Sequence, residues 1–141
     1  GVGHVPTGEV RQDRQGDDVP RRQHRRTRAD LGNLSPSDIG RLGEHVATQF
    51  LEDRGARLLQ RNARIGDGEL DLVVAFDGQR VAVEVKTTSE ASRGEAIFHF
   101  NGAKQRRVRL LANRIGARRV DYVGVEVSAV AATVRWLPGV C

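Results

Sequence analysis

The segment Gly68 to Lys86, GELDLVVAFDGQRVAVEVK, constrains the fold more than any other part of the chain. Apolar and polar residues alternate through most of it, as they do in β-strands that bury one face. Asp77-Gly78 in its middle is a strong signal for a two-residue type I′ turn, because both central residues of that turn need positive φ. We therefore predict a tight β-hairpin. The residues predicted to share its buried face are Leu70, Leu72, Val74, Val81, Val83 and Val85.

A two-residue turn also fixes the pairing of charged residues. It sets Asp71 opposite Glu84 and Glu69 opposite Lys86, so four ionisable groups share one face. Opposed Cβ atoms in an antiparallel pair lie only ~4.5 to 5.5 Å apart. Two carboxylates at that distance repel each other unless a cation lies between them, and a divalent ion such as Mg²⁺ prefers carboxylate oxygens. The alternative is a solvated hairpin face with a Glu69–Lys86 ion pair that contributes little to stability.

The first 35 residues have a different composition from the rest. Apolar side chains are few and show no periodicity, so burial cannot offset the entropy of ordering this segment. We predict a disordered basic N-terminal arm over residues 1–35 and a folded domain over residues 36–141. The arginine-rich stretch at 21–28, RRQHRRTR, is either a flexible tether to nucleic acid or simply solvated.

Apolar runs and cysteines exclude several classes of protein. No run in the chain has the length of a signal peptide or of a membrane span. The single cysteine excludes an internal disulfide framework and a cysteine-rich zinc site. We therefore expect a cytoplasmic protein without a membrane partner.

The domain reads as alternating helices and strands. Ser35-Pro36 begins an amphipathic helix at 36–54, a short strand follows at 56–64, and the hairpin comes next. A second helix at 102–115 precedes strands at 120–127 and 133–137. A helix between strands implies a crossover, which makes the following strand parallel to its neighbour. The order α-β-β-β-α-β-β predicts an α/β fold with a central mixed β-sheet flanked by helices.

The second predicted helix has a basic outer face. No acidic residue occurs from 104 to 119, although the net charge of the whole chain is only +5. Concentrated basic charge favours a phosphate-backbone partner, while arginines that cover apolar surface are the common alternative. The residues that we expect to contact nucleic acid are Lys104, Arg106, Arg107 and Arg109.

Several short motifs occur together in one order. They are Gly43-Glu44, Arg61-Asn62, GELDLV at 68–73, VEVKT at 83–87, Arg93-Gly94 and Lys104-Gln105. In this combination the chain resembles, over about residues 36–127, the YraN-type family (uncharacterised protein family UPF0102). That family is similar in its core to Holliday-junction resolvases and other restriction-endonuclease-like nucleases.

The resemblance implies a fold and a site. The fold would be a restriction-endonuclease-like core, and the activity a metal-dependent endonuclease acting on DNA, with branched DNA as the suggested substrate. Asp71, Glu84 and Lys86 stand where the nuclease motif has its catalytic residues, and Glu44 would join Asp71 and Glu84 as a ligand of Mg²⁺ or Mn²⁺. Glu69 matches a family position and is an additional site candidate. Because resolvases cut twice across a junction, the resemblance also suggests a homodimer.

Two alternatives to a nuclease stay open. A non-catalytic nucleic-acid-binding or adaptor protein would keep the fold and the charge without hydrolysis. A structural partner in a larger assembly would use the basic face alone, and changes at Asp71 or Glu84 would then leave its function intact.

Overall fold

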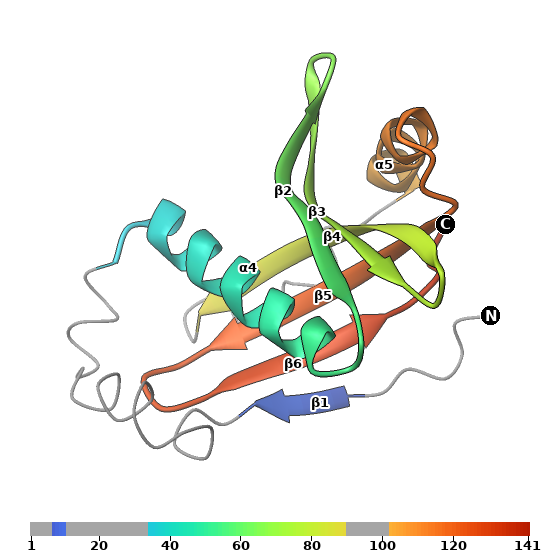
Figure 1. Cartoon of the computed structure of the whole chain (residues 1–141). Coiled ribbons are helices and arrows are strands. Elements are labelled where there is room, and N and C mark those ends of the chain that lie inside the picture. Colours follow the sequence, from blue (N-terminus) through green and yellow to red (C-terminus); the bar gives the residue numbers. More distant parts are fainter. Residues whose placement is uncertain (1–6, 11–33, 90–101) are drawn as a thin grey trace.

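A computed structural model describes residues 7–10, 34–89 and 102–141 of the chain. Within these residues a six-stranded sheet has the order β1-β6-β5-β4-β3-β2. Helices α4 and α5 lie on opposite faces of it (Figure 1). The elements are β1 (Thr7–Val10), α4 (Pro36–Glu52), β2 (Arg57–Ile65), β3 (Gly68–Phe76), β4 (Gln79–Ser89), α5 (Gly102–Arg114), β5 (Arg119–Val127) and β6 (Ala132–Leu137).

The predicted α/β fold with its mixed sheet is confirmed. From α4 onward the elements follow the predicted order α-β-β-β-α-β-β, with ends within two residues of those expected except at β4, which continues three residues past Lys86 to Ser89. Strands β4 and β5, joined through α5, are parallel, and the other neighbouring strands pair antiparallel. The Asp77-Gly78 turn has positive φ at both residues, 54° and 73°, as the type I′ prediction requires.

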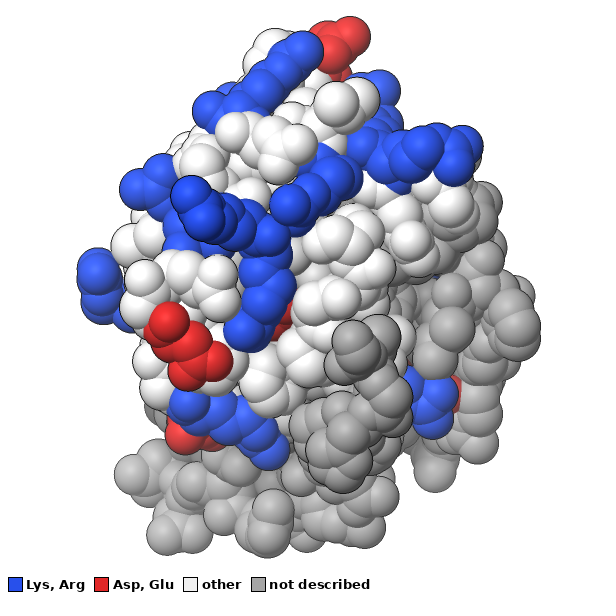
Figure 2. Space-filling model, turned by 90° about the vertical axis from the view of Figure 1, so that its right-hand side faces the viewer, with Lys and Arg blue, Asp and Glu red and all other residues white. Residues whose placement is uncertain are grey.

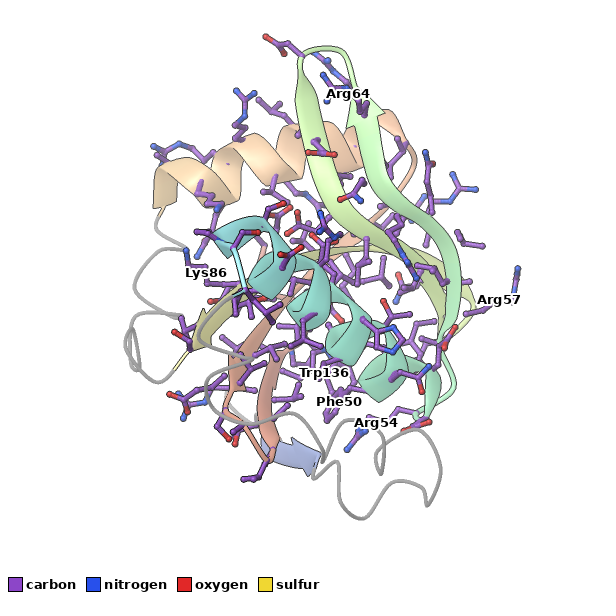
Figure 3. The ribbon with its side chains drawn as sticks, turned by 90° about the vertical axis from the view of Figure 1, so that its left-hand side faces the viewer. Phe50, Arg54, Arg57, Arg64, Lys86 and Trp136 are labelled. Carbon is purple, nitrogen blue, oxygen red and sulfur yellow. The ribbon has the colours of Figure 1, made fainter. Side chains whose placement is uncertain are left out.

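Helix α4 begins where its capping sequence predicts. The Ser35 hydroxyl accepts a hydrogen bond from the Asp38 amide, and the Asp38 carboxylate accepts one from the Ser35 amide. Pro36 occupies the first turn, where its missing amide costs nothing. The buried face of α4 packs on the sheet, where Phe50 lies edge-on to Trp136 of β6 (Figure 3).

The core consists of two apolar layers, one on each face of the sheet. The layer under α4 includes Phe50, Leu51, Val83 and Val125. The layer under α5 includes Leu111 and Tyr122. Both helices are thereby fixed to the central strands β4 and β5 by buried apolar surface, the dominant favourable contribution to folding.

Strand β3 separates from β4 halfway along its length. The paired residues run from Phe76–Gln79 to Leu72–Val83 and end there, whereas β3 continues beside β2 to Gly68. The β2–β3 hairpin consequently rises away from the sheet (Figure 1). The site described below lies where the two strands part.

This separation corrects two sequence predictions. Leu70 does not share the buried face of Leu72, but packs in the layer under α5, because the free part of the hairpin turns toward that helix. Glu69 does not lie opposite Lys86. Its partner in the sheet is Arg64 of β2, while Lys86 pairs with Gly124 of β5.

Most of the predicted arm lies outside the described residues, so its disorder stays a prediction. Four of its residues, Thr7–Val10, form strand β1 against β6, which the sequence did not predict. A strand that short takes its backbone hydrogen bonds from a neighbouring edge, so its own composition gives little signal. Arg93-Gly94 also falls outside the described residues. No helix in the described ranges is long and apolar enough to cross a bilayer.

Candidate active site

Asp71 and Glu84 form an acidic pair where β3 leaves β4. The charge of Asp71 raises the pKa of Glu84, so the two carboxyl groups lie within electrostatic range of each other. Asp71 Oδ2 accepts a hydrogen bond of 2.8 Å from the Val85 amide, which fixes the Asp71 side chain against β4 after the strands stop pairing. The two residues therefore lie close together, although they do not pair in the β3–β4 ladder as predicted.

Burial makes this pair electrostatically unusual. The Glu84 side chain is 7% exposed, and burial, followed by the charge of Asp71, raises its pKa to about 8. Burial also raises the pKa of Asp71. Two neighbouring buried carboxyl groups cannot both ionise cheaply, so the pair holds a proton near neutral pH. Perturbed carboxyl groups of this kind are concentrated at functional sites.

Glu44 of α4 lies within electrostatic range of the acidic pair. Partial burial and then the charges of Asp71 and Glu69 raise its pKa. Glu69 itself is exposed on the free part of β3. The structure therefore brings both Glu44 and Glu69 within electrostatic range of Asp71, and Glu69 is the more exposed of the two.

Two lysines lie near the acidic pair. Lys104 of α5 is exposed, and its positive charge lowers the pKa of both Asp71 and Glu84. Lys86 is two residues from Glu84 on β4, so the strand period places both on the same face. In Figure 3 Lys86 lies beside the first turn of α4.

The carboxyl groups are only partly arranged for a metal ion. Among the described residues no group of three His, Cys, Asp or Glu side chains is close enough to hold one. Glu84 Oε1, however, is buried without a hydrogen-bond partner. A buried carboxylate oxygen without a donor is costly unless a cation or a proton satisfies it. Carboxylate oxygens such as those of Asp71 and Glu84 are the ligands that a hard divalent ion prefers.

Basic side chains gather near this site. Figure 2 shows Lys and Arg spread over the upper part of the face that carries α5. Lys104, Arg106 and Arg107 are exposed on that helix, as predicted for residues that contact nucleic acid. Arg109 is half-buried, and its guanidinium donates to the carbonyl oxygens of Arg118 and Cys141 at 2.8 and 3.2 Å. Arg109 thus fastens the last residue of the chain to α5.

Asn62 is a site candidate for which no role was predicted. This residue has a φ of 53°, although it lies within a strand. In the ladder it faces Asp71, between the pairs Arg61–Leu72 and Ala63–Leu70. Asparagine tolerates the left-handed region better than most residues, and such conformations concentrate at functional sites. The only sequence signal for it was its place in the Arg61-Asn62 motif.

Comparisons with known proteins agree with this part of the chain. The uncharacterised protein family UPF0102 matches residues 43–125, which hold the acidic pair and α5. A UPF0102 protein of Clavibacter michiganensis is 42% identical over 96 residues, 62% of this chain and 81% of that protein. One of Paenarthrobacter aurescens is 37% identical over 113 residues, 73% of this chain and 93% of that protein.

A search of solved structures gives a more distant likeness. The structure of Pyrococcus furiosus SfsA in complex with Ca²⁺ has a TM-score of 0.38 and 13% sequence identity, covering 70% of this chain and 63% of that chain. The sequence comparisons are far closer, and they confirm the resemblance inferred from the motifs: the chain belongs to the uncharacterised protein family UPF0102.

Proposed function

We propose that this protein is a metal-dependent endonuclease that hydrolyses phosphodiester bonds of DNA, with branched DNA as its preferred substrate. The observation that carries the proposal is the buried acidic pair with its unsatisfied Glu84 Oε1, placed beside a basic helix. A solvated hairpin face would leave both carboxylates in water with ordinary pKa values. Burial of such groups is costly, so a function that uses them is the better explanation.

The roles of the residues follow from their positions. Asp71 and Glu84 would hold a divalent ion, Mg²⁺ or Mn²⁺, with Glu44 as a further ligand. When bound, that ion supplies a Lewis acid for a phosphoryl oxygen and lowers the pKa of a water. Lys86, on the same face of β4 as Glu84, would stabilise negative charge on the phosphate. Lys104, Arg106 and Arg107 would bind the DNA backbone without reading its sequence.

A non-catalytic nucleic-acid-binding protein is the second candidate. One observation favours it: within the described ranges no three carboxylates are arranged to hold an ion. This candidate explains the basic helix but gives no reason for burying Glu84. The two candidates differ in whether the acidic pair matters for activity.

The test is cleavage of labelled linear, flap and four-way-junction DNA with Mg²⁺ or Mn²⁺. We expect metal-dependent cutting that EDTA stops and that Glu84→Gln and Asp71→Asn abolish, with the junction cut fastest. Glu52→Gln, at an exposed position at the end of α4, is the matched control and should cut normally. DNA binding without cutting, unchanged by Glu84→Gln, would support the second candidate. Light scattering tests the proposed homodimer, for which we expect a molar mass twice that of one chain.

A further inference from the structure

The edge strand β2 carries three exposed arginines that the proposed mechanism does not use. They are Arg57, Arg61 and Arg64. β2 is the last strand in the sheet order, so one of its sides pairs with no other strand among the described residues. Figure 3 shows Arg57 near the base of the strand and Arg64 near the tip of the β2–β3 hairpin.

These arginines differ from the ones that hold the fold together. Several guanidinium groups donate to carbonyl or carboxylate oxygens of the protein, and those structural arginines are Arg41, Arg54, Arg80, Arg109 and Arg119. No hydrogen bond or ion pair within the described part of the chain holds the side chains of the three β2 arginines. Their charge is therefore available to an external partner.

The middle arginine lies next to the acidic pair. Arg61 pairs with Leu72, the neighbour of Asp71, and its charge acts on Glu44 from the side of β2. Lys104 acts on the same acidic pair from α5. The carboxyl groups thus lie between a basic helix and a basic strand edge.

We propose that the β2 edge formed by Arg57, Arg61 and Arg64 binds the phosphate backbone of double-stranded DNA, as a second contact surface besides α5. The inference deepens the proposed function and rests on it. With a rise of about 3.3 Å per residue, positions 57 to 64 span roughly 23 Å. That length corresponds to about seven base pairs at 3.4 Å each. Arginine side chains are long and present paired donors to phosphate oxygens, so guanidinium groups spaced along this edge can reach phosphates of a duplex that lies along it.

Charged residues on an edge strand also have a simpler explanation, which is protection against pairing with another sheet edge. That explanation predicts that removal of the arginines promotes self-association and leaves DNA affinity unchanged. Phosphate binding predicts that removal of the arginines lowers DNA affinity and does not promote self-association. Each phosphate contact releases counterions, so the loss of contacts also weakens the dependence of affinity on salt.

The experiment measures the affinity of the full chain for a labelled 20-base-pair duplex by fluorescence anisotropy in EDTA, at several salt concentrations. For Arg57→Gln/Arg61→Gln/Arg64→Gln we expect the slope of log affinity against log salt to flatten by ~2.7, about 0.9 for each lost contact. The same three positions changed to Lys should keep the wild-type slope. Arg135→Gln, at an exposed position on β6, is the control and should leave the slope unchanged.

A wild-type slope in the triple Gln variant, or no duplex binding by the wild type, would overturn the inference. The inference would also be overturned if Arg135→Gln flattened the slope as much per lost charge as the triple variant does, since the slope would then depend on net charge alone. Cleavage measured in parallel separates this inference from the proposed function. A flattened slope without any metal-dependent cutting rejects the nuclease and keeps the β2 surface. Metal-dependent cutting by the wild type, together with an unchanged slope in the triple Gln variant, keeps the nuclease and rejects the β2 surface.

Discussion

Gly43 of α4 and Thr87 of β4 lie so close that a Cβ atom at position 43 would be 1.7 Å from Thr87 Oγ1. Thr87 is short and β-branched, so it has little freedom to turn away. Glu44 is the next residue of the helix. The close contact therefore determines how near Glu44 comes to the sheet that carries Asp71 and Glu84.

Gly43→Ala should lower the free energy of unfolding by at least about 2 kcal/mol, because the added methyl group forces the helix off the sheet. Gly40→Ala, three residues earlier in the same helix, is the control. Nothing lies within 4 Å of its added Cβ, and we expect it to stabilise the protein by about 0.5 to 1 kcal/mol. Urea unfolding measures both. Similar free energies for the two variants would show that the Gly43–Thr87 contact adapts without cost.

The stability of the metal-free protein should fall as the pH rises from about 4.5 to about 8. Over this range the unfolded chain has released the Glu84 proton, whereas the folded protein keeps it, since its pKa is raised from 4.5 to about 8. The folded state then binds more protons, and the free energy of unfolding decreases by up to about 1.4 kcal/mol per pH unit. Asp71, whose pKa is also raised, contributes with the same sign.

Glu84→Gln should remove most of this dependence and be more stable than the wild type at pH 8, when both are measured in EDTA by urea unfolding. The exposed Glu52→Gln variant should follow the wild-type profile. If Glu84→Gln kept the wild-type slope, Glu84 would not be the group that carries the proton.

Local sequence signals were sufficient for most of the fold. The Ser35 capping box, the Asp77-Gly78 turn and the apolar periodicities each depend on neighbouring residues, and each element was found where it was predicted. Strand β1 was missed because its partner edge, β6, is far away in the sequence.

The candidate site was predictable in part. The hairpin register brought Asp71 and Glu84 together, but it also placed Glu69 opposite Lys86, which is wrong. The pairing of Glu69 with Lys86 was predicted from the hairpin register, which holds only as long as the two strands stay paired. The separation of β3 from β4 depends on the packing of the hairpin tip against α5, where Gly68 lies close to Leu111. Such a tertiary contact leaves no signal in the spacing of charges.

Divalent metal should stabilise the protein through the acidic pair. Because binding requires deprotonated carboxylates, Mn²⁺ should raise the melting temperature more at pH 8 than at pH 6. For a dissociation constant of about 1 mM, about 10 mM ion contributes ~1.4 kcal/mol, a shift of a few degrees. Asp71→Asn and Glu84→Gln should abolish the shift, and EDTA should reverse it in the wild type. An equal shift in both variants would place the metal elsewhere.

Asp121 of β5 lies opposite Val83 of β4, and its buried hydrogen-bond network supplies a test of the scaffold. Its carboxylate is 1% exposed and accepts two hydrogen bonds from Arg119, at 2.9 and 3.0 Å, and others from Trp136 Nε1 and the Gly139 amide. Asp121→Asn removes the charge and leaves the Arg119 guanidinium, itself half-buried, with a weaker partner. We expect the free energy of unfolding to fall by about 3 kcal/mol.

Trp136 is the only tryptophan of the chain, so its fluorescence reports directly on this network. Asp121→Asn should shift its emission in the folded protein, while the exposed Asp53→Asn should change neither the emission nor the stability by more than about 0.5 kcal/mol. Since the hydrogen-bond partners of Asp121 include neither Asp71 nor Glu84, pH dependence and metal stabilisation should persist in the Asp121→Asn variant wherever it remains folded. Loss of both in the folded variant would mean that the network and the acidic pair form one cooperative unit.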